Sequence, residues 1–178
     1  ADESERVGRF MRTTTSVRAG EALLLEPPSF LSPAPGKELD ALVSRLCDRQ
    51  ATDAEAATQP DGRLPLPWLL ALSIVDTLVA GATSEAMASL GELRGDPAQW
   101  TAGARRFWGV LSRRTQSKLG ESQVGDIFAK IAMNAHDCGG RRAGLFVVGS
   151  LAEHSCAPNA FKEVVVVKPE DMAAVRAL

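Results

Sequence analysis

The spacing of hydrophobic positions changes twice along the chain. Up to Pro28 the apolar residues fit two short strands joined by a turn at Arg18-Ala19-Gly20-Glu21. Between about residues 36 and 133 the apolar positions recur with the 3.6-residue period of a helix, and we call this segment the helical block. Strand-like runs return after Asn134. Strands, then helices, then strands predict an α+β fold with segregated helices, divided into residues 1–35, 36–133 and 134–178.

The helical block is expected to hold four or five helices. One apolar stripe predicts a helix over 37–50 and places the Cys47 thiol in the core. Proline and capping residues mark the starts of later helices. These helices are expected at 68–80, from Ser84 to near Gly95, from Asp96 to about Leu111, and at 122–133. After the block, strands are expected at Leu145–Val148, Phe161–Val167 and Met172–Leu178.

Composition restricts the possible partners. With 178 residues, 45% of them hydrophobic, and a formal net charge of -2, the chain fits a globular protein without a main nucleic-acid surface. The best basic cluster, with arginines at 105, 106, 113 and 114, is explained by a solvated helix face. The apolar run from Leu64 to Ala80 contains two prolines and Asp76, which favours a buried helix over a membrane span. Three cysteines without a C-x-x-C pair, and no N-terminal hydrophobic signal, predict the cytosol or nucleus.

The residues best suited to chemistry are concentrated between His136 and Cys156. Both histidines and two of the three cysteines of the chain lie there. His136-x-Cys138 and His154-x-Cys156 can supply four tetrahedral zinc ligands, because residues i and i+2 share one side of an extended chain. Alternatively, His154 and Cys156 act as base and nucleophile, or both are simply packed in the core. The residues alone leave these three interpretations open.

Residues 153–159, which we call the EHSCAPN motif, resemble the Asn-His-Ser-Cys-x-Pro-Asn motif of SET-domain protein lysine methyltransferases, particularly the branch with a MYND insertion. The single departure is Glu153. The start of the chain is also similar to the opening of a SET domain, where Gly-x-Gly-Leu precedes an x-Ala-Gly-Glu turn and a strand ending in Glu-x-Pro. Here Phe10 stands at the second glycine, while the turn and the Glu26-Pro27-Pro28 ending match. The helical block occupies the position of that family's insertion.

The resemblance implies a SET-like α+β fold of short strands with a helical insertion. It also implies that S-adenosylmethionine is the cofactor and that a lysine of a protein substrate is methylated. The net charge and the interrupted apolar run at 64–80 predict neither nucleic acid nor a membrane as partner. Gly8, Arg9 and Phe10 would lie along the cofactor, and Asn134 would contact its amino-acid part. His154 would meet the adenine through its main chain, and Glu153 would stand where an asparagine amide donates. Without the family, a helix cap explains Asn134 equally well.

The departures from the family lead to further expectations. The chain has no tyrosine, so no catalytic residue is assigned within it. It also lacks the Gly-Glu-Glu turn, the cysteine-rich post-SET segment and the MYND finger, and we expect an inactive fragment of a longer enzyme, with weak cofactor affinity and no stoichiometric zinc. The alternative is a non-catalytic SET-like module that binds a protein partner. Phe10 and Glu153 favour this module, and the otherwise intact EHSCAPN motif opposes it.

Overall fold

A computed structural model describes residues 16, 18–19, 21, 24, 26–48, 50–51, 64–81, 84–96 and 102–151. The chain forms two compact units. The larger unit is Pro28–Val147, and the smaller unit combines Ala1–Pro27 with Val148–Leu178.

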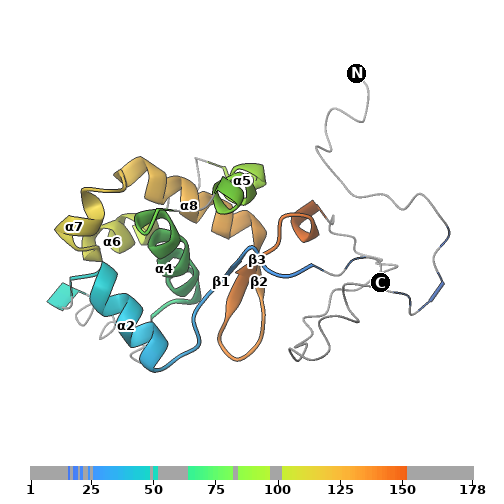
Figure 1. Ribbon diagram of the computed structural model, residues 1–178, viewed down its shortest axis with the longest axis horizontal. Coiled ribbons are helices and arrows are strands. Elements are labelled where there is room, and N and C mark those ends of the chain that lie inside the picture. The colour runs from blue at the N-terminus through green and yellow to red at the C-terminus, as the bar shows by residue number, and fades with distance from the viewer. Residues whose placement is uncertain are drawn as a thin grey trace, which may run out of the picture. The chain divides into compact units, whose positions relative to one another are not determined.

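The described part of the helical block forms helices in the predicted order (Figure 1). They are α2 (Lys37–Leu46), α4 (Leu66–Val79), α5 (Ser84–Glu92), α6 (Ala102–Val110), α7 (Arg113–Gln116) and α8 (Glu121–Asn134). Helix α2 ends before its predicted limit, because Cys47 turns to extended backbone and forms an isolated bridge with Leu111. The four-residue helix α7 was not predicted; it begins where the Ser112 hydroxyl accepts the Thr115 N–H, 3.3 Å away.

Three short antiparallel strands belong to the larger unit, in the order β1 (Phe30–Leu31), β3 (Ala143–Leu145), β2 (Ala135–Asp137). Phe30 lies opposite Leu145 on one side of β3, and His136 lies opposite Gly144 on the other. Strand β1 precedes every described α-helix, and the other two strands follow the last of these, α8 (Figure 1). The helical block is therefore inserted between two parts of one sheet, and the α+β class is confirmed.

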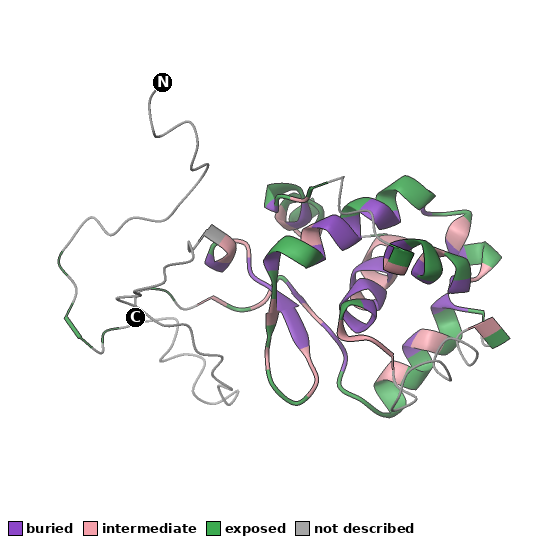
Figure 2. Cartoon of the chain, turned by 180° about the vertical axis from the view of Figure 1, so that it is seen from behind, coloured by how far each residue is buried: buried purple, intermediate pink, exposed green. Residues whose placement is uncertain are grey.

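The core of the larger unit is built around α4. Its residues Leu70, Ile74 and Val75 are fully buried, and the helix packs against α2, α8 and the strands β1 and β3. Figure 2 shows the buried positions gathered between these elements. Cys47 is also buried, as predicted. In the described segments no helix is long and apolar enough to cross a membrane.

A surface ion pair joins α2 to α4. The Arg45 guanidinium donates from Nε to Asp76 Oδ1 and from Nη2 to Asp76 Oδ2, with both donor–acceptor distances 2.9 Å. The hydrogen bond to Asp76 raises the pKa of Arg45 above its ordinary value. The Arg45 side chain is exposed and that of Asp76 is partly exposed, so this ion pair adds little to the stability of the fold.

The predicted strand Leu145–Val148 is wrong beyond its first residue. The strand in this region is β3, which begins at Ala143 and ends at Leu145, and a turn follows at 147–148. A single 3-10 turn, η2 (Gly149–Leu151), comes next. The expected strands at 161–167 and 172–178, the first strand of the predicted hairpin, and most of the second lie outside the described residues.

Candidate functional site

Most cofactor-binding residues implied by the resemblance lie outside the described residues. These are Gly8, Arg9, Phe10, Glu153 and His154. The described segments do include Asn134, the turn that begins at Arg18, and the segments next to the EHSCAPN motif and the predicted hairpin.

The predicted turn at Arg18–Glu21 is present. The Glu21 main-chain N–H donates to the Arg18 carbonyl oxygen at 3.1 Å, the bond that closes a four-residue turn. In return, the Arg18 main-chain N–H donates to Glu21 Oε2 at 2.6 Å. The glutamate of the x-Ala-Gly-Glu pattern thus helps to hold the turn that its sequence position predicted.

Glu26, at the end of the Leu-rich segment, links two distant parts of the smaller unit. Its Oε1 accepts the Val148 N–H at 2.9 Å, and its Oε2 accepts the Gly149 N–H at 2.7 Å. These two N–H groups stand at the start of η2, where backbone donors have no partner within the turn. The carboxylate therefore ties the end of the predicted hairpin to the segment that leads into the EHSCAPN motif.

Asn134 is the last residue of α8 and is buried, with 7% of the residue exposed. Its Nδ2 donates to the Arg94 carbonyl at 2.6 Å and to the Lys130 carbonyl at 2.8 Å. The first bond holds the segment after α5 against the last turn of α8. Since an amide nitrogen carries two hydrogens, both donors are in use, and Oδ1 is the atom left to accept from a ligand.

His136 is the middle residue of β2, and Cys138 directly follows the strand. The His136 ring packs beside Phe146 with ring centroids 5.8 Å apart, and Cys138 Sγ donates weakly to the His136 carbonyl at 3.6 Å. Within the described ranges, no three histidine, cysteine, aspartate or glutamate side chains gather closely enough to hold a metal ion. His154 and Cys156 lie outside those ranges, so the four-ligand zinc interpretation stays a prediction.

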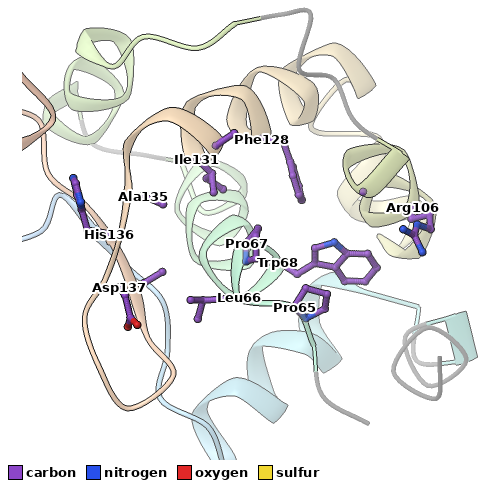
Figure 3. Close-up of a pocket in the computed structure, with 13 residues that line it drawn as sticks. Pro65, Leu66, Pro67, Trp68, Arg106, Phe128, Ile131, Ala135, His136 and Asp137 are labelled. Atoms are coloured by element: carbon purple, nitrogen blue, oxygen red, sulfur yellow. The ribbon is translucent and has the colours of Figure 1, made fainter. Parts of the chain in front are cut away.

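The larger unit contains a cavity of about 480 Å³ that the sequence analysis missed. It lies between the start of α4, α6, the last turns of α8 and strand β2 (Figure 3). Its described lining includes Pro65, Pro67, Trp68, Phe128 and Arg106. The run Pro65-Leu66-Pro67-Trp68 was interpreted only as a helix start, although two prolines beside a tryptophan are also typical of a rigid apolar surface.

Comparison of the chain with protein-family models, curated proteins and solved structures finds no match.

Proposed function

We propose that this chain is part of an S-adenosylmethionine-dependent protein-lysine methyltransferase of the SET type. The observation that carries the proposal is the Glu26 carboxylate, which bonds to the N–H groups of Val148 and Gly149. The two sequence segments that resemble SET proteins are separated by more than a hundred residues. This contact joins the end of the predicted hairpin to the residues that lead into the EHSCAPN motif. The two segments must lie close together in this way if they form one site.

Two further features support the same function. The turn at Arg18–Glu21 forms with the hydrogen bonds described above. The helical block enters and leaves a single antiparallel sheet, since β1 pairs with β3, and an insertion into a SET-like core would have this topology. The turn and the position of the helical block were predicted from the resemblance, whereas the strand β1 and its pairing with β3 were not.

The reaction would transfer a methyl group from the cofactor's sulfonium to a lysine amine. A lysine side chain has an unperturbed pKa of roughly 10.4, so the amine must first lose a proton to expose its lone pair. The new N–C bond then forms as the S–C bond breaks, and the electron pair returns to sulfur. In-line positioning supplies most of the rate in such a displacement. The main chain of Gly8, Arg9 and His154 would hold the cofactor, and the Asn134 Oδ1 would accept from its ammonium.

The test uses the natural gene product that contains this chain. Incubation with methyl-labelled S-adenosylmethionine and mixed cell lysate should place label on protein lysine, and mass spectrometry would identify the residue. The 178-residue chain alone should transfer none, because it has no tyrosine to align the amine. A gene product that binds the cofactor but transfers no label would reject the enzymatic proposal.

A charge substitution tests the cofactor site itself. Glu153 would face the cofactor's carboxylate, and removing one of two like charges should strengthen binding roughly fivefold, or about 1 kcal/mol. Glu153→Asn in the gene product should therefore tighten S-adenosylmethionine binding by calorimetry. Glu163→Gln removes the same charge elsewhere and should leave the affinity unchanged. Equal effects from both variants would show that only overall charge matters.

The second candidate is a SET-like module that binds a protein partner without catalysis. Asn134 favours it, because both of its amide hydrogens are committed to carbonyl oxygens of the chain's own backbone. A residue occupied in this way stabilises the fold whether or not a cofactor is present. Undetectable S-adenosylmethionine binding by the gene product would support this candidate over the enzyme.

A further inference from the structure

We infer that Glu26 is a positioning residue for the proposed cofactor site and acts through the two main-chain N–H groups that its carboxylate holds. Since this role is defined by that site, it rests on the proposed methyltransferase function. The resemblance to SET domains assigns Glu26 no role in binding or catalysis. The carboxylate fixes the backbone at Val148 and Gly149, and the EHSCAPN motif begins four positions after Gly149.

The start of η2 has no capping side chain of its own. The first N–H groups of a helical turn have no acceptor within the turn, and a short polar side chain just before it usually supplies one. Val148 stands at that position, and its side chain cannot accept a hydrogen bond. Gly149 is buried, so water has little access to its N–H. The acceptor therefore comes from Glu26, more than a hundred positions away in the sequence.

A carboxylate suits this task better than a neutral acceptor. Oε1 accepts the Val148 N–H at 2.9 Å and Oε2 accepts the Gly149 N–H at 2.7 Å, so each oxygen has its own donor. Hydrogen bonds to a charged acceptor are stronger than those between neutral groups, and a pair of them fixes orientation as well as distance. The backbone at the start of η2 is thus held in one orientation relative to the Glu26 side chain.

The backbone that carries Glu26 is itself restrained. Pro27 follows it directly, and the residue before a proline is largely confined to extended conformations. Beyond the second proline, the Ser29 N–H donates to the Leu145 carbonyl oxygen at 2.8 Å. A carboxylate on a restrained backbone loses less entropy in holding its partners than one on a free chain. The position of Glu26 therefore determines where η2 begins.

The first part of the test is spectroscopic and uses the 178-residue chain without cofactor. Glutamine has a single side-chain oxygen, and its amide would present hydrogens to the second N–H. Glu26→Gln should therefore shift the amide proton resonances of Val148 and Gly149 and speed hydrogen exchange at Gly149 about tenfold. Glu21→Gln removes the carboxylate that accepts the Arg18 N–H and should leave both resonances unchanged. Unchanged Val148 and Gly149 resonances in Glu26→Gln would overturn the inference.

The second part measures S-adenosylmethionine affinity in the natural gene product by calorimetry, at a temperature where circular dichroism shows every variant folded. Glu26→Gln should weaken binding about tenfold, the effect of one lost hydrogen bond to a charged group. Glu26→Asp should weaken it similarly, because a side chain one methylene shorter cannot reach both N–H groups. Glu21→Gln should bind as the unaltered product does. A purely structural role for Glu26 would lower the melting temperature and leave the affinity of the folded protein unchanged.

Two further results distinguish failure of this role from failure of the proposed function. If the unaltered product binds the cofactor and Glu26→Gln binds equally well, or if Glu26→Asp keeps full affinity, Glu26 does not position the site through its paired hydrogen bonds. The inference is then rejected and the proposed function stands. If the unaltered product does not bind the cofactor, both are rejected.

Discussion

Asn134 and Gly95 both belong to the contact between helix α8 and the segment that follows α5. Asn134 at the end of α8 bonds to the Arg94 carbonyl. Gly95, which follows Arg94, lies very close to α8. A Cβ added to it would be 2.9 Å from the Lys130 nitrogen and 3.0 Å from the Ala129 Cβ. The segment after α5 is therefore held against α8 by the Asn134 hydrogen bond, which we call the Asn134 clamp, and by the close approach of the Gly95 backbone.

Loss of the Asn134 amide should weaken the fold measurably. Asn134→Ala removes the donor to two carbonyl oxygens, and we expect the free energy of unfolding to fall by about 1–3 kcal/mol in urea denaturation. Met133→Ala changes an exposed neighbour on the same helix and should stay within about 0.5 kcal/mol of the parent chain. Similar values for the two variants would show that the clamp is not needed for stability, and would leave a ligand-binding role for Asn134.

Two glycines should respond in opposite directions to the same substitution. Gly95→Ala forces a methyl group against the backbone of α8 and should destabilise the chain by about 1–3 kcal/mol. Gly91→Ala, in α5 with open space around its Cβ position, should stabilise it by about 0.5–1 kcal/mol through helix propensity. Thermal unfolding of both variants checks the pair, and a destabilised Gly91→Ala would show that α5 packs differently.

At the scale of elements, the sequence predicted the long helices better than the strands. A stripe such as Leu39, Leu42 and Leu46 repeats often enough to define a period, and α2 formed around it. Strands β1 and β2 span two and three residues, too few for an alternating pattern. They form because β3 lies between them. The pairing of β1 with β3 joins residues more than a hundred positions apart, which no local pattern contains.

The candidate site could be predicted only where its features are local. The turn at Arg18–Glu21 is encoded in four consecutive residues and was found. The Glu26 carboxylate contact and the cavity each join separate segments of the chain, so no local pattern of residues predicts them. Asn134 was selected for its place in a family pattern, whereas its side chain is engaged by two backbone carbonyls.

Helix α6 should matter to the fold chiefly through Phe107. This ring is fully buried between Trp68 of α4 and Phe128 of α8, so Phe107→Ala removes the contact that joins three helices. We expect a loss of about 3–5 kcal/mol in denaturant unfolding. Arg105→Ala, exposed on the same helix, should cost less than about 0.5 kcal/mol. A loss below about 1 kcal/mol for Phe107→Ala would mean that α6 is not part of the central core.

At the scale of the molecule, the sheet and the main core belong to one unit. All three described strands and the helices packed on them lie within Pro28–Val147. The helical block thus shares its core with the strands that flank it, because α4 packs directly on β1 and β3. An insertion arranged in this way is not an appendage that could be removed without exposing the sheet.

Residues 28–147 should therefore fold when expressed alone. A chain of about 120 residues can bury roughly two thirds of its unfolded surface, which is enough for an independent core. We expect a helical circular dichroism spectrum and one cooperative transition, with the unfolding free energy within about 2 kcal/mol of that of the 178-residue chain. Phe107→Ala should lower the stability of both chains by the same amount, since its neighbours all lie inside the larger unit. A chain of residues 28–147 that stays unfolded would show instead that the terminal segments contribute essential stability to the core.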